Sequence, residues 1–190
     1  MSDPRTTQGG RLTTPQRLLV LDLDETLMFA SLFRLPSVPD FRLGLAEAVR
    51  RPGLDVFLDR CFSLFRVAVW TSATTEYAAE ALAHLLPAHT ELAFVWSREQ
   101  CHRETDPVGG DDYWVKDAGR LAEQGYALDS LLVLDDEPRG WAAHRDHVLP
   151  IPKFRGDPAD TVLTSLLPIL AGAAVAPDIP MFLRQFEFTT

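Results

Sequence analysis

Cysteine is scarce in this sequence. Two cysteines, Cys61 and Cys101, occur among 190 residues, which argues against a disulfide framework and against a zinc site built from cysteine clusters. Cys61 falls within an apolar helical pattern, whereas Cys101 lies in a polar stretch beside His102. We therefore expect two reduced thiols rather than a disulfide or a metal-binding pair.

Basic residues are outnumbered by acidic ones. The chain has 18 Lys and Arg against 27 Asp and Glu, which gives a net charge of −9. Because nonspecific nucleic-acid binding requires a basic footprint, this balance argues against a nucleic acid as partner. A local basic patch around a substrate remains compatible with it.

Long apolar runs are absent as well, so no segment is expected to span a membrane. The most apolar stretch, residues 162–176, contains Pro168 and Gly172, and we interpret it as a packed helix followed by a loop. Residues 1–16 are polar, which predicts a flexible lead-in and not a signal peptide. A chain of this length and composition, with 46% hydrophobic residues, predicts one globular domain in the cytoplasm.

Aliphatic runs and amphipathic helical patterns alternate along the chain. Residues 18–22 (LLVLD) show no polar alternation, which is typical of a strand covered on both faces. Such strands alternating with helices predict an α/β fold with a mostly parallel sheet. The other expected strands are residues 66–70, 91–96, 131–135 and 147–152, and the expected helices are residues 54–65, 75–86, a helix starting near Asp117, and residues 159–170.

Three segments fall outside this alternation. The stretches FRLGL (41–45) and EAVRRPG (47–53) predict a small β-hairpin flap. Residues 103–112 contain two glycines and are expected to form a long polar loop. The pattern of residues 177–190 assigns them to no helix or strand. We expect this segment to pack against the domain rather than to bind a partner. Its aromatic residues are Phe182, Phe186 and Phe188.

Polar residues follow three of the aliphatic runs directly. They are Asp22, then Thr71 with Ser72, then Asp135 with Asp136. Because ligands bind outside the carboxyl ends of parallel strands, these residues should gather at one edge of the sheet. Several carboxylates cannot stay ionised together without a counter-cation, and oxygen-only ligands favour Mg²⁺ over zinc.

A site of this kind suits phosphoryl chemistry. A metal ion, a lysine such as Lys116 and a hydroxyl group can together neutralise a phosphoryl group. One carboxylate can attack phosphorus, and a second can protonate the leaving oxygen and then activate water. Asp22 and Asp24 are the candidates for these two roles.

Four ordered motifs resemble those of the haloacid dehalogenase superfamily. DLDET at residues 22–26, followed by Leu27, resembles its DxDx(T/V) signature. VAVWTSA, YWVKDAGRL and LLVLDDEP look like its second, third and fourth motifs. RRPGLDVFLDR and TTEYAAEAL are similar to segments of one branch, the NLI-interacting-factor-like phosphatases, which include phosphatases of the RNA polymerase II C-terminal domain. The resemblance covers the chain from about Leu18 to about Leu170.

The resemblance implies roles for individual residues. Asp22 would be the nucleophile and Asp24 the general acid and base. Thr71, or with less support Ser72, would bind the phosphoryl oxygens, Lys116 would offset their charge, and Thr26 would order the loop after the nucleophile. The implied substrate-binding residues are Thr26, Thr71, Ser72 and Lys116, and the implied Mg²⁺ residues are Asp22, Asp24 (including its backbone carbonyl), Asp135 and Asp136, the last two either directly or through water.

The implied architecture is a three-layer, Rossmann-like domain with a mostly parallel central sheet and a small hairpin flap. It would comprise residues 17–176, between the lead-in 1–16 and a C-terminal extension 177–190. The implied function is a Mg²⁺-dependent phosphatase that acts through an aspartyl-phosphate, with phosphoserine or phosphothreonine in a protein or peptide as substrate. The alternatives are a phosphatase of nucleic-acid ends or small metabolites and, from a different class, a non-catalytic binding domain. Glu137 departs from the branch, which commonly has Ser there.

Overall fold

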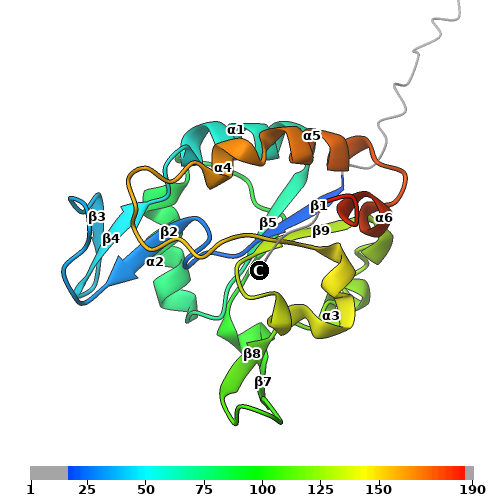
Figure 1. The fold of residues 1–190 in the computed structure, drawn as a ribbon, viewed down its shortest axis with the longest axis horizontal. Coiled ribbons are helices and arrows are strands. Elements are labelled where there is room, and N and C mark those ends of the chain that lie inside the picture. Colours follow the sequence, from blue (N-terminus) through cyan, green and yellow to red (C-terminus); the bar gives the residue numbers. More distant parts are fainter. Residues whose placement is uncertain (1–16, 187–190) are drawn as a thin grey trace, which may run out of the picture.

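Five short aliphatic strands form one parallel sheet at the centre of the structure (Figure 1). The computed structural model describes residues 17–186. The strand order is β10-β9-β1-β5-β6, and every neighbouring pair is parallel. The strands are β1 (Leu18–Leu21), β5 (Arg66–Trp70), β6 (Val95–Trp96), β9 (Leu131–Asp135) and β10 (Val148–Pro150). The predicted α/β fold with a parallel sheet is confirmed, although the strand expected over residues 91–96 is shorter.

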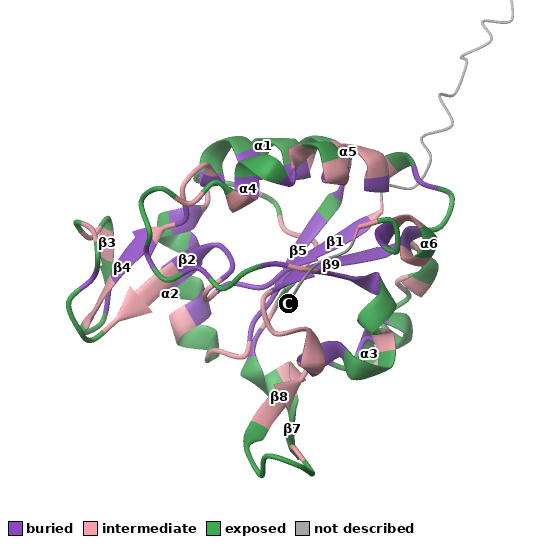
Figure 2. Cartoon of the chain, viewed as in Figure 1, coloured by how far each residue is buried: buried purple, intermediate pink, exposed green. Residues whose placement is uncertain are grey.

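Alternate residues of the strands belong to two separate apolar cores. Leu19 and Leu21 lie in the larger core, whereas Leu18 and Val20 lie in the smaller one. Side chains of a strand point alternately to opposite faces, so a fully aliphatic strand requires cover on both. Figure 2 shows the buried strands between layers of helices that are exposed on their outer sides.

Helices supply this cover. The larger core takes side chains from α1 (Leu54–Leu64), α2 (Thr75–Leu85), α4 (Val162–Ser165), α5 (Leu167–Val175) and α6 (Ile179–Leu183). The smaller core takes them from α3 (Gly119–Glu123) and the 3₁₀ segment η3 (Pro138–His147). Two further 3₁₀ turns are η1 (Arg98–Gln100) and η2 (Leu128–Ser130).

The predicted flap is present as a small antiparallel sheet at one end of the molecule (Figure 1). Its strands, in the order β2-β4-β3, are β2 (Met28–Ser31), β3 (Phe41–Leu43) and β4 (Ala46–Arg50). Strand β2 follows the DLDET segment directly, so the flap is built onto the loop that carries Asp22 and Asp24.

The prediction of a polar loop over residues 103–112 is wrong at both ends, because only residues 106–111 lie outside strands. The segment forms a second hairpin, β7 (His102–Thr105) and β8 (Asp112–Val115), which projects from the body of the domain (Figure 1). All four residues of β7 are exposed, so the strand has no alternation of apolar and polar residues that a sequence could reveal. The turn is closed by the Asp106 carboxylate, which accepts hydrogen bonds from the N–H groups of Val108 and Gly109.

The interpretation of residues 162–176 as a helix followed by a loop is also wrong, as is the single helix expected over 159–170. Two helices, α4 and α5, follow one another, and the second continues to Val175. Pro168 occupies the first turn of α5, where the missing N–H costs nothing. Gly172 lies inside α5 because the ring of Phe182 packs against it; a Cβ there would lie 2.6 Å from that ring.

Three further expectations concern the two cysteines, membrane-spanning helices and the two ends of the chain. Cys61 and Cys101 are both free, as expected. Across residues 17–186, none of the helices has the length and apolar character needed to cross a bilayer. The proposed flexible lead-in 1–16 and Phe188 lie outside the described residues.

Candidate active site

The carboxyl ends of three neighbouring strands open into one cavity of about 330 Å³. Asp22 follows β1, Asp135 ends β9, and Thr71 follows β5. Backbone hydrogen bonds hold this edge of the sheet in register. The N–H of Asp22 donates to the carbonyl of Leu134 (2.9 Å), and the N–H of Thr71 donates to the carbonyl of Trp96 (2.9 Å). Of the residues singled out from the sequence, those that line the cavity are Asp22, Asp24, Thr71, Ser72, Lys116, Asp135 and Asp136.

Lys116 forms the electrostatic centre of the cavity. Its buried Nζ donates to Asp22 Oδ1 at 2.6 Å and to Asp135 Oδ2 at 2.7 Å. Burial alone would lower the pKa of Lys116, but the two carboxylates outweigh it and raise the pKa above its ordinary value. The ammonium group therefore remains charged and links the ends of β1 and β9.

The carboxyl group of Asp22 is buried beside two further carboxylates, whose effect on it Lys116 opposes. Burial raises the pKa of Asp22 well above its ordinary value, and the charges of Asp135 and Asp136 raise it further, whereas Lys116 opposes them. The ionised form of Asp22 is therefore disfavoured mainly because the carboxylate is removed from water. Such a group requires a further cation to be stably ionised.

The DLDET loop is a tight turn that holds its residues in place. The N–H of Glu25 donates to the carbonyl of Met28 (2.7 Å), and that of Leu27 to Leu23 (2.9 Å). Glu25 has a positive φ of 62°, a conformation that non-glycine residues adopt only where surrounding contacts impose it. Thr26 is fully buried, and its hydroxyl donates to Asp136 Oδ1 at 2.9 Å. This hydrogen bond connects the DLDET loop to Asp136, which follows β9.

Asp24 lies at the edge of the cavity and has a tyrosine as its partner. The hydroxyl of Tyr77 donates to Asp24 Oδ1 at 2.5 Å. Burial raises the pKa of Asp24, and the hydrogen bond from Tyr77 opposes that shift. A raised pKa favours the protonated form, which a general acid requires.

The two hydroxyl residues after β5 are placed differently. Thr71 is buried at the cavity wall, and its Oγ1 accepts a hydrogen bond from the N–H of Ala73 at 3.1 Å. Within residues 17–186 the Thr71 hydroxyl donates to no protein acceptor, so its hydrogen is available to a ligand. Ser72 is half-buried and lines both this cavity and a second one beside it.

Three carboxylates could hold a metal ion together. Ligand oxygens of Asp22, Asp135 and Asp136 lie within 4.8 Å of one another. All the donors are oxygens, which fits Mg²⁺. Asp135 already accepts hydrogen bonds from Lys116 Nζ, the Trp141 indole (2.8 Å) and the N–H of Glu137 (2.8 Å). The carboxylate of Asp24 is not in this group of three.

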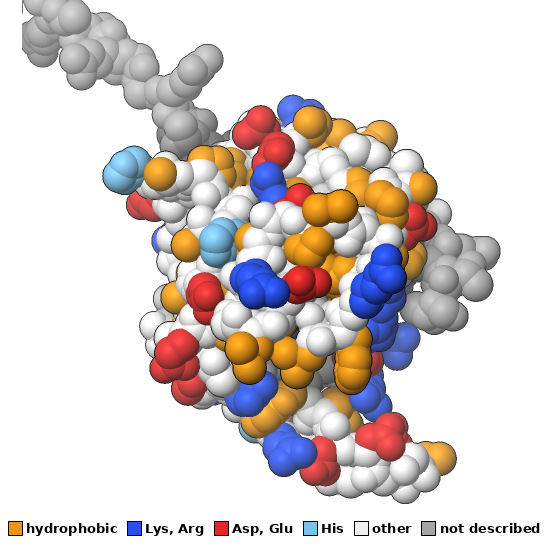
Figure 3. Space-filling view, turned by 90° about the vertical axis from the view of Figure 1, so that its left-hand side faces the viewer, with side chains coloured by type: hydrophobic (Ala, Val, Ile, Leu, Met, Phe, Trp, Pro, Cys, Tyr) orange, Lys and Arg blue, Asp and Glu red, His pale blue; other side chains and the backbone are white. Residues whose placement is uncertain are grey.

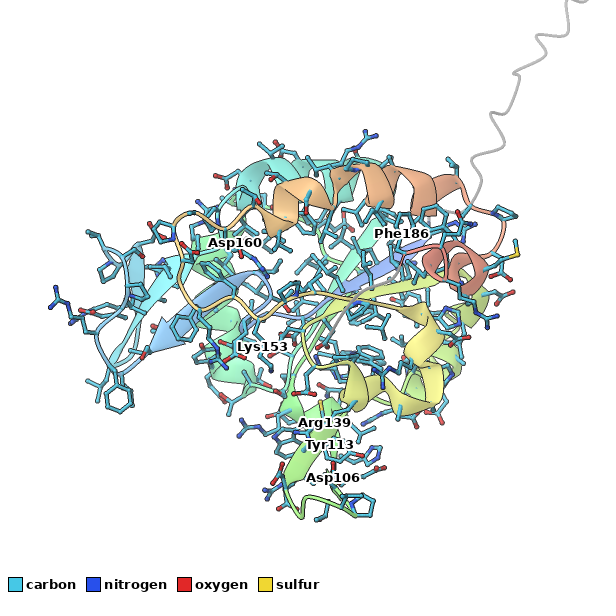
Figure 4. The ribbon with its side chains drawn as sticks, in the orientation of Figure 1. Asp106, Tyr113, Arg139, Lys153, Asp160 and Phe186 are labelled. Atoms are coloured by element: carbon cyan, nitrogen blue, oxygen red, sulfur yellow. The ribbon has the colours of Figure 1, made fainter. Side chains whose placement is uncertain are left out.

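The rim of the cavity carries further cations. Lys153 Nζ contacts Asp136 (2.9 Å), Glu25 (3.3 Å) and Glu137 (3.4 Å). Arg139 stacks on the ring of Tyr113, 4.8 Å from its centroid, and so holds η3 against the hairpin that forms one wall (Figure 4). Figure 3 views the molecule from the end that carries the β2-β4-β3 sheet. In this view, Lys and Arg side chains gather along one edge, above the β7-β8 hairpin.

Sequence reasoning missed four residues of this site: Tyr77, Lys153, Arg139 and Arg51. The side chain of Arg51 binds the backbone of the DLDET loop from behind, with Nη1 3.2 Å from the carbonyl oxygen of Thr26. Arg51 lies in the RRPG segment and Tyr77 in TTEYAAEAL, so the branch-specific motifs were the available signal. Lys153 and Arg139 carried no such signal.

Comparison with known proteins identifies relatives over most of the chain. The family model for NLI interacting factor-like phosphatases matches residues 17–180. Carboxy-terminal domain RNA polymerase II polypeptide A small phosphatase 1 of Homo sapiens is 31% identical over 176 residues, which cover 88% of this chain and 63% of that protein. Phosphatase PSR1 of Saccharomyces cerevisiae is 29% identical over 171 residues, 86% of this chain and 38% of that protein. The chain thus spans less than two thirds of either relative.

A solved structure agrees with the fold. The structure of Fcp1, described as an essential RNA polymerase II CTD phosphatase, superposes with a TM-score of 0.54. Its sequence identity is 18%, and the match covers 85% of this chain and 48% of that chain. At this identity the likeness concerns the fold alone, and it agrees with the predicted architecture.

Proposed function

This chain belongs to the NLI interacting factor-like phosphatases, the branch of the haloacid dehalogenase superfamily that its motifs predict, and we propose that it hydrolyses phosphoserine or phosphothreonine in proteins through an aspartyl-phosphate. The observation that carries the proposal is the position of Lys116, which lines the cavity and donates hydrogen bonds to both Asp22 and Asp135. This arrangement fixes one carboxylate, Asp22, beside a buried positive charge where a phosphoryl group can enter.

The chain's own residues supply the proposed steps. Asp22 attacks phosphorus while Asp24 gives its proton to the leaving oxygen, and the aspartyl-phosphate forms. Asp24 then takes a proton from the water that attacks phosphorus and releases Asp22. Lys116 and the hydroxyl of Thr71 hold the phosphoryl oxygens through both steps.

The proposed cofactor is Mg²⁺, which Asp22, Asp136 and the backbone carbonyl of Asp24 would hold. Asp136 is preferred to Asp135 as the direct ligand because Asp135 accepts three hydrogen bonds, one of them from the buried ammonium group of Lys116. Asp136 accepts two, from Thr26 and from the partly exposed Lys153. When bound, the ion supplies positive charge that offsets the carboxylates and the phosphoryl oxygens.

A protein substrate is supported by the relatives. The name of the human relative refers to the carboxy-terminal domain of an RNA polymerase II polypeptide, and such a domain is part of a protein. The net charge of −9 argues against nucleic-acid ends.

The test is hydrolysis of p-nitrophenyl phosphate with Mg²⁺ and with EDTA, followed by a panel of phosphopeptides, sugar phosphates and nucleotides. We expect Mg²⁺-dependent turnover, a loss on the order of 10³-fold in Asp22→Asn, and a higher kcat/KM for phosphopeptides. A preference for metabolites or nucleotides would replace the proposed substrate, and absence of turnover with every substrate would favour the binding-domain alternative.

A further inference from the structure

Asp24 is fixed through one oxygen and open at the other. Its Oδ1 accepts the hydrogen bond from Tyr77 (2.5 Å), whereas its Oδ2 accepts none from the part of the chain that the structure describes. The carboxyl group borders two cavities: the catalytic one and a second of about 320 Å³. The open oxygen is therefore available to a group that bridges the two spaces.

Tyr77 is itself rigidly placed. Its ring packs against the larger apolar core, and its N–H donates to Oγ1 of Thr74, the N-cap of α2. In the same turn, Thr75 Oγ1 lies 2.7 Å from Ser97 Oγ, which ties the start of α2 to η1. The Tyr77 hydroxyl is thus a fixed donor on a helix that begins just after Thr71.

The second cavity borders the same two groups. It is lined by Asp24, Ser72, Ala73, Thr74, Tyr77 and Arg98. It adjoins the catalytic cavity at Asp24 and Ser72, the only residues that appear in both linings.

We propose that Tyr77 is a positioning residue, which turns the open oxygen of Asp24 toward the leaving-group oxygen of an alkyl phosphate bound beside Asp22. The proposal rests on the proposed function and goes beyond it, because it assigns a role in the reaction to a residue outside the proposed catalytic set. As the bond from Asp22 to phosphorus forms and the ester bond breaks, the proton of Asp24 passes to the alcohol oxygen. Tyr77 keeps its own proton throughout.

Leaving-group chemistry separates this role from a merely structural one. p-Nitrophenolate is a stable anion and departs without a proton, whereas an alkoxide requires one. A misplaced acid therefore slows alkyl phosphates selectively. A general loss of folding or of phosphate binding would slow both kinds of substrate alike.

The test compares Tyr77→Phe with a matched control, Tyr113→Phe. Tyr113 lines the catalytic cavity but donates to Glu104 (3.0 Å) instead of Asp24. The quantity measured is kcat/KM, which reports the step in which the leaving group departs, for p-nitrophenyl phosphate and for a phosphoserine peptide. Thermal unfolding of each variant verifies that it is folded.

We expect Tyr77→Phe to lower kcat/KM for the phosphoserine peptide at least about tenfold more than for p-nitrophenyl phosphate, a part of the gain that general acids provide. Tyr113→Phe should change both by the same factor. In an Asp24→Asn background, Tyr77→Phe should no longer change the ratio, because coupled residues are not additive.

Equal effects of Tyr77→Phe on the two substrates would overturn the positioning role. Such a result is distinct from failure of the proposed function, which Asp22→Asn tests separately with p-nitrophenyl phosphate. If Asp22→Asn abolishes turnover and Tyr77→Phe is unselective, the phosphatase assignment stands and only the role of Tyr77 falls.

Discussion

Arg51 and Asp160, 109 residues apart, form a bidentate ion pair in which Nε and Nη2 donate to the two carboxylate oxygens at 3.0 and 2.9 Å (Figure 4 labels Asp160). The Arg51 side chain is 0% exposed. The same guanidinium donates to the carbonyls of Thr26 (3.2 Å) and Pro152 (3.0 Å). The loop that carries the candidate nucleophile is therefore fastened to the chain segment after β10.

Asp160→Asn should destabilise the protein strongly. It leaves the buried guanidinium of Arg51 without its counter-charge, and breaking a buried pair in this way costs about 3–5 kcal/mol. The measurement is urea unfolding, where the midpoint should fall at an unchanged slope.

An exposed ion pair serves as the matched control. Arg42 and Glu47 lie 3.3 Å apart with side chains 70% and 37% exposed. Glu47→Gln should change the free energy of unfolding by less than about 1 kcal/mol. Similar small changes in both variants would mean that the Arg51 pair does not fasten the loop.

Asp22→Asn should stabilise the metal-free protein at neutral pH. Burial raises the pKa of Asp22, so the folded state holds the proton more tightly than the unfolded state, and the ionised carboxylate costs stability. That cost is full above the raised pKa and vanishes as the pH falls to the unfolded value of about 3.9. Lys116 keeps Asp135 as a partner in the variant.

The free energy of unfolding should be measured in EDTA from pH 7 to pH 4. The advantage of Asp22→Asn over the wild type should shrink as the pH falls, and adding Mg²⁺ at pH 7 should reduce it as well. A variant less stable than the wild type at pH 7 would contradict this account of the acidic cavity.

Asp136→Asn should weaken Mg²⁺ binding by at least about tenfold, the scale seen when groups around a metal are lost. The reason is that Asp136 belongs to the group of three carboxylates that can share an ion. Calorimetric titration measures the affinity directly, and the rise of the unfolding midpoint with added Mg²⁺ measures it independently.

Glu137→Gln is the matched control for this prediction. Glu137 lines the same cavity and is adjacent in sequence, but it lies outside the group of three carboxylates. Equal losses of affinity in the two variants would indicate that only the general negative charge of the cavity matters.

The parallel sheet and the gathering of polar residues at its edge could be predicted because both depend on local signals. The aliphatic runs are buried on both faces, and each is followed directly by the acids or hydroxyls of a motif. Burial of this kind leaves a continuous apolar pattern in the sequence. The four motifs then supply the order in which the site residues occur.

What could not be predicted depends on surface strands and on long-range pairing. The hairpin of β7 and β8 is held by backbone hydrogen bonds and exposed pairs such as Arg103 with Asp112, which leave no apolar period. Tyr77 is separated from Asp24 by 53 residues, and its helical pattern indicates only that it faces the core. Lys153 reaches Asp136 from the irregular segment after β10, and no local pattern encodes the path of that segment.

The central claim is that Asp22 becomes phosphorylated during turnover. The most direct measurement is rapid acid quenching of the protein with a ³²P-labelled phosphopeptide in Mg²⁺, followed by peptide mapping. The account predicts transient label on the peptide that contains Asp22, lost on exposure to hydroxylamine and absent in Asp22→Asn. Phosphate release by the wild type with no label at Asp22, or equal release by Asp22→Asn, would contradict it.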